Sequence, residues 1–535
     1  MKGSWLVEFI PPDDSAYPPL PQATKVNEVG LSTGREFDSG PGAAAVRAGR
    51  QSSARLGMAC IVIVFAVVAW FGTRHGIGFS WRECDTQAIA RNFVIDGFDP
   101  LRPRVDWRGD SDGAVECEFP AYQLLIGAAL VMFGDVEWPG RALALFAMVG
   151  AMVALYRLLE VRAGAAGALA GSLVFACSGS ACMLSTRVMP DSLSLAFAIA
   201  SMVPFVRFLQ TGSGLALVLA AAALAMSGLQ KPLALQIGLL QFGWVLVMAP
   251  QRLRDRRLWV AFSCVLGVVG AWLEHGRRVH AETGLTFGVI SGGDSKFPDL
   301  EHLLSGGTWL GLGGACLQYG CSIFGALAFG WLLIRRRLDR RDVVWILAIL
   351  VGLVVSLRYS CSVGLGPHYH MFAAALGAWL VARAWPERAS KWAWLMLLAA
   401  TAGHAAWRMK AERGMRNVVA QHPLHAVAAE IRRGSEPHQL LVVRSWKTRQ
   451  DPEWQRPQNI EDPSLFYQSH RRGWVLAKDE FEVSRLEDLR RRGAHLIADL
   501  GRGPMPVATQ QWLAQNTDLL LEHPRGQLYR VKPSR

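Results

Sequence analysis

Acidic and basic residues directly flank several long apolar runs of this chain, where they could bind a charged group or transfer a proton. The first set follows the first apolar run, in the stretch Glu83-Cys84-Asp85. A carboxylate there could take a proton from a hydroxyl or an amine, which is general base catalysis. The simpler alternative is that Asp85 caps the helix that follows, because Asp is a preferred N-cap residue. The spacing alone leaves both interpretations open.

Other candidate residues come from distant parts of the sequence but occupy the same kind of position. They are Glu118, Arg187, Asp191, Lys231, His368 and His370, with Glu83 and Arg91 flanking Asp85. Each has an ordinary explanation: Asp191 can cap a helix, Lys231 can extend from a membrane interface toward water, and the histidines can be polar residues at a helix end. Acids and bases gathered at one interface would instead form a site for a substrate that is partly lipid. A chance scatter of polar helix ends is the alternative.

Membrane-spanning helices are the elements that must position these residues. The chain has 535 residues, of which 51% are hydrophobic, which is too long and too apolar for one soluble domain. The apolar residues come in long blocks such as Leu56 to Gly72, which carries no charge. With its flanks this block approaches the roughly 20 residues that cross a bilayer. Several such blocks predict several crossings.

The distribution of basic residues sets the predicted orientation. The formal net charge is +13, and arginines are concentrated in short loops at 251–257 and 335–341, with further basic residues at 383–391. Short loops rich in Lys and Arg remain in the cytoplasm. The linkers that hold the candidate residues therefore face the opposite side. The basic residues form no aromatic-studded patches, which argues against nucleic acid as a partner.

These rules predict about eleven crossings, with the N-terminus inside and the C-terminus outside. The apolar run 119–133 is predicted to be an interfacial helix on the outer leaflet, because counting it as a crossing would place the arginine-rich loops outside. The spans are expected at 56–73, 139–159, 163–185, 190–209, 213–229, 232–249, 258–275, 309–334, 343–357, 367–384 and 392–407.

Three regions follow from this pattern, and the predicted fold class is mainly α. Residues 1–55 are expected to form a disordered cytoplasmic tail, and residues 56–409 a multi-pass helical domain. Residues 410–535 are expected to form a small extracytoplasmic α/β domain, since the composition becomes that of a soluble protein from His422. Within it, helices are predicted at 424–431 and 486–492, and strands at 440–443 and 495–498.

In their order and spacing, four features of the sequence resemble a known family. They are the acid followed by Ile89-Ala90-Arg91-Asn92-Phe93, the step Glu118-Phe119-Pro120, the stretch Arg187 to Ser192, and the pair Lys231-Pro232. Together they resemble the multi-span GT-C-type glycosyltransferases that include the protein O-mannosyltransferases and the lipid A aminoarabinose transferases. The resemblance covers the chain from about Trp81 to Lys231 and, more loosely, to His370.

The resemblance implies transfer of a sugar from a polyprenyl-phosphate donor to a lipid, glycan or protein acceptor, on the extracytoplasmic face of a bacterial plasma membrane. Asp85 then corresponds to the catalytic carboxylate that deprotonates the acceptor. The protein mannosyltransferases have adjacent Asp and Glu there, so the partner acid differs in this chain. The resemblance also implies that Glu83, Glu118, Asp191, His368 and His370 lie near the sugar or the acceptor, and that Arg91, Arg187 and Lys231 hold the carrier phosphate.

Two other functions would suit a protein of this kind. A flippase or transporter for lipid-linked sugars would bury charges near the bilayer midplane and often has repeated halves, whereas the charges here lie at span ends and no repeat is apparent. A polysaccharide polymerase or ligase would depend on Arg and His in a large late loop. A divalent cation is compatible with the acids, which show no recognisable ligand spacing. Cys84 and Cys117 share one outer loop, and either a disulfide or two unrelated thiols fits them.

Overall fold

The computed structural model describes residues 41–72, 80–292, 297–362, 366–420, 424–445, 447–450, 459–500, 504–523 and 526–533. The chain forms two units, Met1–Gln51 and Ser52–Arg535, and the description below concerns the second unit apart from the first turns of α1. Residues 1–40 of the predicted tail lie outside the described residues. Helix α1 begins at Pro41, within the segment predicted as a tail.

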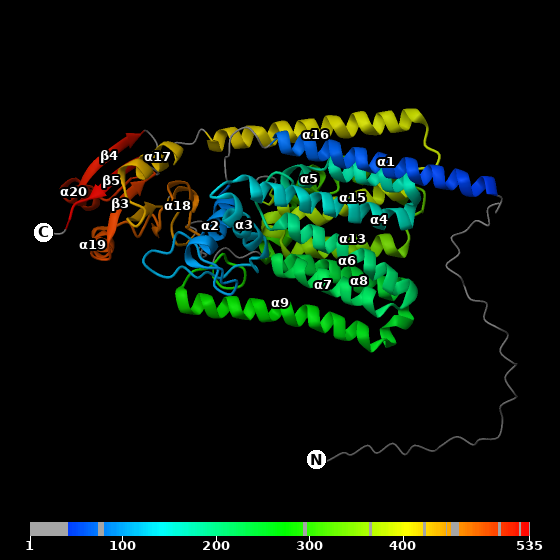
Figure 1. Ribbon diagram of the computed structural model, residues 1–535, viewed down its shortest axis with the longest axis horizontal. Helices are drawn as coiled ribbons and strands as arrows, with labels where there is room; N and C mark the ends of the chain where they lie inside the picture. Colours follow the sequence, from blue (N-terminus) through cyan, green and yellow to red (C-terminus); the bar gives the residue numbers. More distant parts are fainter. Residues whose placement is uncertain are drawn as a thin grey trace, which may run out of the picture. The chain divides into compact units, whose positions relative to one another are not determined.

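A bundle of helices makes up the first and larger part of the second unit (Figure 1). All eleven predicted spans fall on helices, which confirms the mainly helical fold. The helices of the bundle are α1 (Pro41–Gly72), α4 (Trp138–Ala176), α5 (Gly179–Leu184), α6 (Asp191–Thr211), α7 (Gly214–Gln230), η1 (Pro232–Leu235), α8 (Gln236–Met248), η2 (Pro250–Arg254), α9 (Arg256–Thr283), α10 (Leu300–Leu304), α11 (Gly306–Tyr319), α12 (Ser322–Ile334), α13 (Arg340–Val355), α14 (Leu357–Ser360), η3 (Pro367–His370), α15 (Met371–Ala384) and α16 (Lys391–Ala420).

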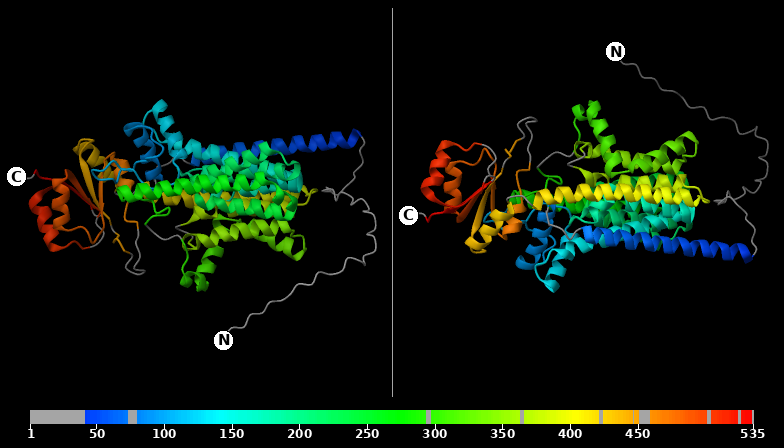
Figure 2. Two further views of the ribbon diagram at one scale, coloured as in Figure 1. Left: turned by 90° about the horizontal axis from the view of Figure 1, so that it is seen from below. Right: turned by 90° about the horizontal axis from the view of Figure 1, so that it is seen from above.

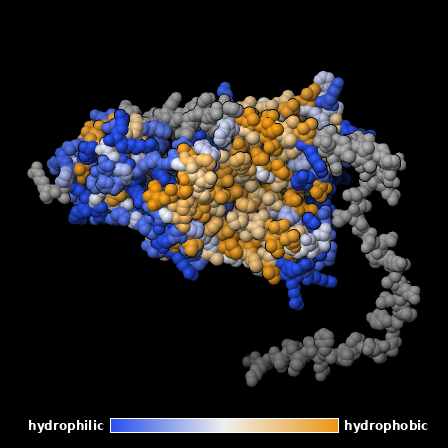
Figure 3. Space-filling view, viewed as in Figure 1, coloured by the Kyte–Doolittle hydropathy of each residue, from blue (hydrophilic) through white to orange (hydrophobic). Residues whose placement is uncertain are grey.

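Fewer helices are long and apolar enough to cross a membrane by themselves. In the described part of the chain α4, α6 and α9 meet that condition, and α11 with α12 would make a fourth if the pair is one broken span. Other apolar helices are shorter than the roughly 20 residues that a crossing needs. The number of crossings therefore stays a prediction. On the face drawn in Figure 3, hydrophobic residues gather over the helical bundle and hydrophilic ones over the C-terminal part.

Two of the predicted spans, 139–159 and 163–185, lie largely in the single long helix α4, which is interrupted at Gly164. Gly164 has φ 72° and ψ 175°, a conformation that glycine adopts without steric cost. Next to this break, Arg162 forms an ion pair with Asp339. Asp339 belongs to the arginine-rich loop between α12 and α13, so the break and that loop lie at the same end of the bundle.

The predicted span 309–334 is two helices rather than one. Helices α11 and α12 meet at Gly320 and Cys321 and are bent by 107° relative to each other. Figure 2 shows α11 turned away from the direction of the bundle. Helix α9 continues to Thr283, beyond the end of the predicted span 258–275.

The segment between α1 and α4, predicted to be the first outer loop and called so below, contains two helices, α2 (Trp81–Asp96) and α3 (Ala121–Phe133). Ser80 is the N-cap of α2, and the Glu83 side chain completes the cap by accepting from the Ser80 amide at 3.0 Å. Asp85 therefore lies inside the helix, and the capping explanation for Asp85 is wrong. Helix α3 forms where the interfacial helix was predicted, and Leu125 and Met132 on it are exposed. Its location at a membrane surface stays a prediction.

The C-terminal part is a small α/β fold, as predicted. Its five-stranded sheet has the order β2-β1-β3-β5-β4, in which β1 pairs in parallel with β2 and β3, and β5 pairs antiparallel with β3 and β4. The predicted helices and strands all appear. The elements are α17 (Leu424–Gly434), β1 (Leu440–Arg444), α18 (Ser464–Ser469), β2 (Gly473–Leu476), α19 (Val483–Arg491), β3 (Ala494–Asp499), α20 (Val507–Asn516), β4 (Thr517–His523) and β5 (Gly526–Val531).

The first outer loop and the C-terminal sheet share one hydrophobic core. Ile89 and Phe93 of α2 and Trp107 of the loop belong to the same buried cluster as Leu441 and Val443 of β1. Backbone hydrogen bonds join the two parts as well, since the amide of residue 109 donates to the carbonyl of residue 473 at 2.6 Å. Residue 109 is a glycine with φ 61°, and a Cβ there would lie 2.1 Å from the Trp474 ring. The loop that carries Asp85 is thus folded onto the C-terminal part.

Candidate functional site

Arg82 is the residue around which the acidic candidates gather. Its guanidinium forms an ion pair with Glu118, which lies just before α3. It also interacts electrostatically with Asp85, one turn further along α2, and with Asp191 at the start of α6. The Phe287 ring lies under the guanidinium, 4.6 Å from ring centroid to Cζ. One half-buried cation therefore connects three carboxylates, two from the same loop and one from the start of α6.

Lys231 forms the second cationic centre of the same cluster. It ends α7, and its Nζ lies 2.5 Å from Asp191 Oδ1 and 5.0 Å from the centroid of the Tyr369 ring. The His368 ring contacts the Tyr369 ring at 4.4 Å between centroids, with the two planes tilted by 36°. His368 also interacts electrostatically with Lys231, Asp191, Arg82 and Arg187, which brings Arg187 into the group. Six of the nine predicted site residues thus meet in one place: Asp85, Glu118, Arg187, Asp191, Lys231 and His368.

Asp85 is fully buried, and its two carboxyl oxygens have different surroundings. Oδ1 accepts a hydrogen bond of 2.9 Å from Trp107 Nε1. Oδ2 has no hydrogen-bond partner among the described residues. Burial raises the pKa of Asp85 to about 8, against the opposing effects of the Trp107 hydrogen bond and the Arg82 charge. A carboxyl group with such a pKa changes its protonation state close to neutral pH, which suits proton transfer.

Three predicted site residues are engaged elsewhere. Glu83 caps α2 and accepts a hydrogen bond of 3.0 Å from the Val188 amide. Arg91 pairs with Asp106 at 2.6 Å and donates to the Tyr467 carbonyl at 3.2 Å, so it joins the outer loop to the C-terminal part. His370 contacts the Ser360 carbonyl at 2.7 Å. These contacts show that Glu83, Arg91 and His370 stabilise the fold at other places. Of the two arginines of α2 near Asp85, only Arg82 belongs to the cluster.

The chain is similar to a known protein family in sequence and to solved structures in fold. Residues 118–273 match the family described as dolichyl-phosphate-mannose-protein mannosyltransferase. The structure of ArnT from Cupriavidus metallidurans in the apo state is similar, with a TM-score of 0.59 and 14% identity over 89% of this chain and 98% of that chain. The chain has a GT-C fold. No curated protein matches it by sequence.

Two further GT-C structures extend the similarity. ArnT bound to undecaprenyl phosphate has a TM-score of 0.55 and 15% identity, covering 89% of this chain and 98% of that chain. The archaeal oligosaccharyltransferase AglB from Archaeoglobus fulgidus, in complex with an inhibitory peptide and a dolichol-phosphate, has a TM-score of 0.51 and 11% identity, covering 83% and 69%. At these identities the similarity establishes the fold.

Within this GT-C fold, sequence reasoning missed three residues of the cluster. Arg82 was not singled out, although it lies three residues before Asp85 and hence on the same face of a helix. Trp107 and Tyr369 had no local pattern that would identify them, because their roles depend on contacts across the fold. Cys84 and Cys117 are both free thiols, so the structure has two unrelated thiols here and no disulfide between them. In the described part of the chain, no three His, Cys, Asp or Glu side chains are grouped so as to hold a metal ion.

Proposed function

We propose that this chain is an integral-membrane glycosyltransferase that transfers a sugar from a polyprenyl-phosphate donor to a lipid, glycan or protein acceptor. The observation that carries the proposal is the cluster of Asp85, Arg82, Glu118, Asp191 and Lys231. In it, a buried carboxyl group with a free oxygen interacts with the Arg82 cation, and a second cation, Lys231, is paired with Asp191. An acid and cations together are what phosphate-linked sugar transfer requires.

The comparisons support the nature of the donor. ArnT has been solved with undecaprenyl phosphate and AglB with a dolichol-phosphate and a peptide, and both share the fold of this chain. A donor that brings its own lipid and a single phosphate needs no loop for binding a nucleotide. By the predicted orientation, the cluster faces the extracytoplasmic side of a bacterial plasma membrane.

Each residue has a role in the proposed reaction. Asp85 Oδ2 takes the proton from the acceptor hydroxyl or amine as the acceptor atom attacks the anomeric carbon. The bond between that carbon and the phosphate oxygen breaks, and the carrier phosphate leaves with both electrons. Lys231 and Arg82 stabilise the charge that develops on it, with Arg187 as a third candidate. Glu118 and Asp191 hold the two cations in place, and in the bound complex the donor phosphate would share these cations.

Part of the outer linker between α9 and α10 closes one side of the cluster. Its Phe287 ring contacts Arg82 and Trp81. Glu116 fixes the segment by accepting hydrogen bonds from the Ile290 and Ser291 amides at 2.9 and 3.1 Å. A lipid-linked sugar bound at Lys231 would therefore meet this segment, which we propose moves when the donor enters.

Mass spectrometry of the whole cell envelope tests the proposal. Glycolipids and glycoproteins are compared between cells that express the chain, cells that lack it and cells that express the Asp85→Asn variant. We expect one added sugar mass, on one class of acceptor, only in cells with the unchanged chain. An unchanged glycolipid and glycoprotein inventory in all three strains would contradict the proposal. A flippase would instead need no Asp85 carboxylate, so an active Asp85→Asn strain would favour that alternative.

A further inference from the structure

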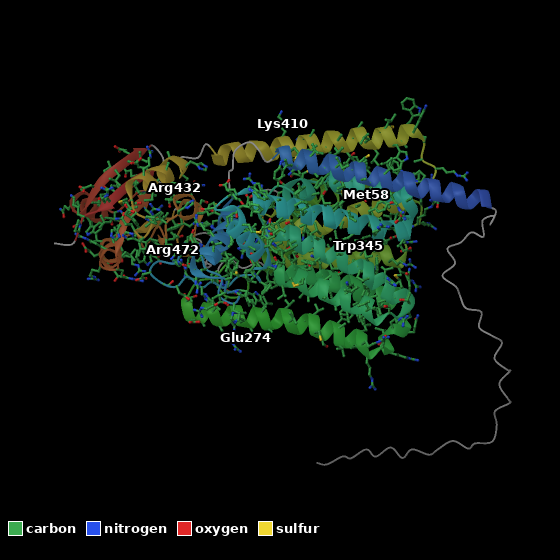
Figure 4. The ribbon with its side chains drawn as sticks, viewed as in Figure 1. Met58, Glu274, Trp345, Lys410, Arg432 and Arg472 are labelled. Atoms are coloured by element: carbon green, nitrogen blue, oxygen red, sulfur yellow. The ribbon has the colours of Figure 1, made fainter. Side chains whose placement is uncertain are left out.

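A cleft of about 910 Å³ lies between the first outer loop and the C-terminal part, away from the Asp85 cluster. Arg91 and Arg108 line it from the outer loop, and Arg432, Arg471 and Arg472 line it from the other side. In Figure 4, Arg432 and Arg472 lie on the C-terminal part, next to α2. The proposed reaction uses none of these side chains.

The positive charge of the cleft exceeds what its carboxylates neutralise. Arg108 and Arg472 share one carboxylate, since both donate to Asp96, at 2.8 and 2.9 Å. Arg432 and Arg471 donate to neutral oxygen atoms, those of the Gln468 carbonyl and of Ser435 and nearby carbonyls. The lining itself contains six arginines and four acids, Asp106, Asp110, Asp135 and Glu436. Asp96 lies outside the lining, and so does Glu430, which pairs with Arg433 at 3.1 Å. Asp106 is already paired with Arg91, and Asp110 with Arg492, which lies outside the cleft.

A histidine at the cleft is kept neutral by burial and by the same arginines. The pKa of His470 is lowered to about 4 by burial and by the charges of Arg91 and Arg432, although Asp135 lies 3.5 Å from its Nδ1. His470 is therefore neutral at pH 7. A positive charge on His470 is disfavoured beside these arginines, and a bound anion would reduce that repulsion.

Apolar side chains form the remaining wall of the cleft. Val94 and Ile95 of α2 and Leu130 of α3 line it, and Ile95 is 61% exposed. Beyond Leu130, the exposed residues Val131, Met132 and Phe133 continue the apolar surface along the end of α3. A soluble anion would make no use of this wall. A molecule with an anionic head and hydrocarbon chains would use both surfaces.

We propose that this cleft binds the phosphate-bearing headgroup of an anionic membrane phospholipid, with its chains along α3. The lipid phosphate would accept hydrogen bonds from Arg432 and Arg472, where charge-assisted bonds are the strong ones. The bound lipid would join the C-terminal part to the membrane surface. The cleft is linked to Asp85 by two adjacent residues. Asp106 pairs with Arg91 at the cleft, and the next residue, Trp107, donates to Asp85.

Binding of a short-chain lipid to the full-length protein in detergent tests the inference. The probes are dihexanoyl phosphatidic acid, dihexanoyl phosphatidylcholine and inorganic phosphate, each titrated by microscale thermophoresis. For the unchanged protein we expect phosphatidic acid to bind at least about tenfold more tightly than either of the other two. Equal affinity for phosphatidylcholine, or for inorganic phosphate, would overturn the proposal of an anionic lipid site.

Variants locate the binding. The double variant Arg432→Gln with Arg472→Gln should weaken phosphatidic acid at least about tenfold, whereas Arg485→Gln, an exposed arginine of α19 paired with Asp488, should change it by less than about twofold. Unchanged affinity in the double variant would contradict the assignment. Thermal melting of each variant without lipid reports folding. If the double variant does not fold, Arg432→Gln alone decides, because Arg432 is exposed and its side chain donates to the Gln468 carbonyl. A drop of about threefold or more supports the site, and a smaller one overturns it.

Discussion

Asp85 combines complete burial with an unpaired oxygen, and this combination is costly in a folded protein. A buried polar atom without a partner destabilises a protein by about 1–3 kcal/mol. The Trp107 bond satisfies Oδ1 and leaves Oδ2 free within the described part of the chain. Such a cost is typical of a functional group that is completed by its ligand. An acceptor hydroxyl that donates to Oδ2 would supply the missing bond.

The raised pKa of Asp85 predicts how transfer depends on pH. A general base must be deprotonated, and a carboxyl group with a pKa of about 8 is mostly protonated at pH 7. Transfer should therefore rise with pH, roughly tenfold per unit well below 8, and level off above it. The measurement is kcat/KM for a fixed donor from pH 5.5 to 9.5. A profile that is flat between pH 6 and 9 would show that Asp85 does not titrate in the free enzyme.

At the residue scale, the sequence predicted six of the residues that meet in the cluster but not how they are joined. Asp85, Glu118, Asp191 and Lys231 could be placed together because the charge bias put all of them at the same ends of the spans. Arg82 and Trp107 could not be identified in this way. Their contacts depend on how the outer loop folds over α2, and no local spacing encodes that arrangement.

Among the elements, α13 and α15 are joined by a buried ionic contact at the end of the bundle opposite the site. Asp342 is fully buried, accepts from Trp379 Nε1 at 2.7 Å and pairs with Arg383 at 3.3 Å. Asp342 also closes the N-terminal cap of α13 with Asp339. This carboxylate therefore fixes the start of one helix and the end of another.

Replacing Asp342 by Ala should destabilise the bundle strongly. The change removes the hydrogen-bond partner of the Trp379 indole and the closer of the two carboxylates that pair with Arg383, which keeps Asp339 at 3.6 Å. Breaking a buried pair costs about 3–5 kcal/mol. We expect a clear fall in melting temperature in detergent. Glu282→Ala is a matched control, because its ion pair with Arg102 is at the surface and such pairs contribute at most about 1 kcal/mol. Equal melting temperatures for the two variants would contradict the role of Asp342.

Helix positions were predictable from the sequence, whereas breaks within apolar runs were not. The run 309–334 is apolar throughout and reads as one span. The structure divides it because the chain bends at Gly320 and Cys321, where the Tyr319 carbonyl accepts a hydrogen bond of 2.7 Å from Ser180 of α5. Hydropathy carries no information about such a contact between distant helices.

For the whole second unit, the shared core makes the C-terminal part a structural support for the loop that carries Asp85. The Trp81 indole donates to the Glu461 carbonyl, and Arg91 donates to the Tyr467 carbonyl. Both donors belong to α2, the helix that carries Asp85. The sequence predicted a small α/β domain but not its contacts with α2, because these contacts span more than 350 residues.

Deleting residues 421–535 should therefore unfold the first outer loop while the bundle persists. Removal exposes the apolar face formed by Ile89, Phe93 and Trp107. Hydrogen exchange followed by mass spectrometry should show α2 amides that exchange at least about a hundredfold faster than in the full chain, with α6 amides unchanged. Full protection of α2 in the truncated protein would mean that the loop folds without this support.

The most direct test of the central claim is transfer by purified protein from a radiolabelled polyprenyl-phosphate sugar to acceptors extracted from the cell envelope. Asp85→Asn removes the base and keeps the shape of the side chain, so turnover should fall by about a hundredfold or more. The control Asp112→Asn alters an exposed acid of the same loop, paired with Arg102, and should retain nearly full turnover. Near-normal turnover by Asp85→Asn, in a variant that melts at the temperature of the unchanged protein, would contradict the claim that this carboxylate is the base.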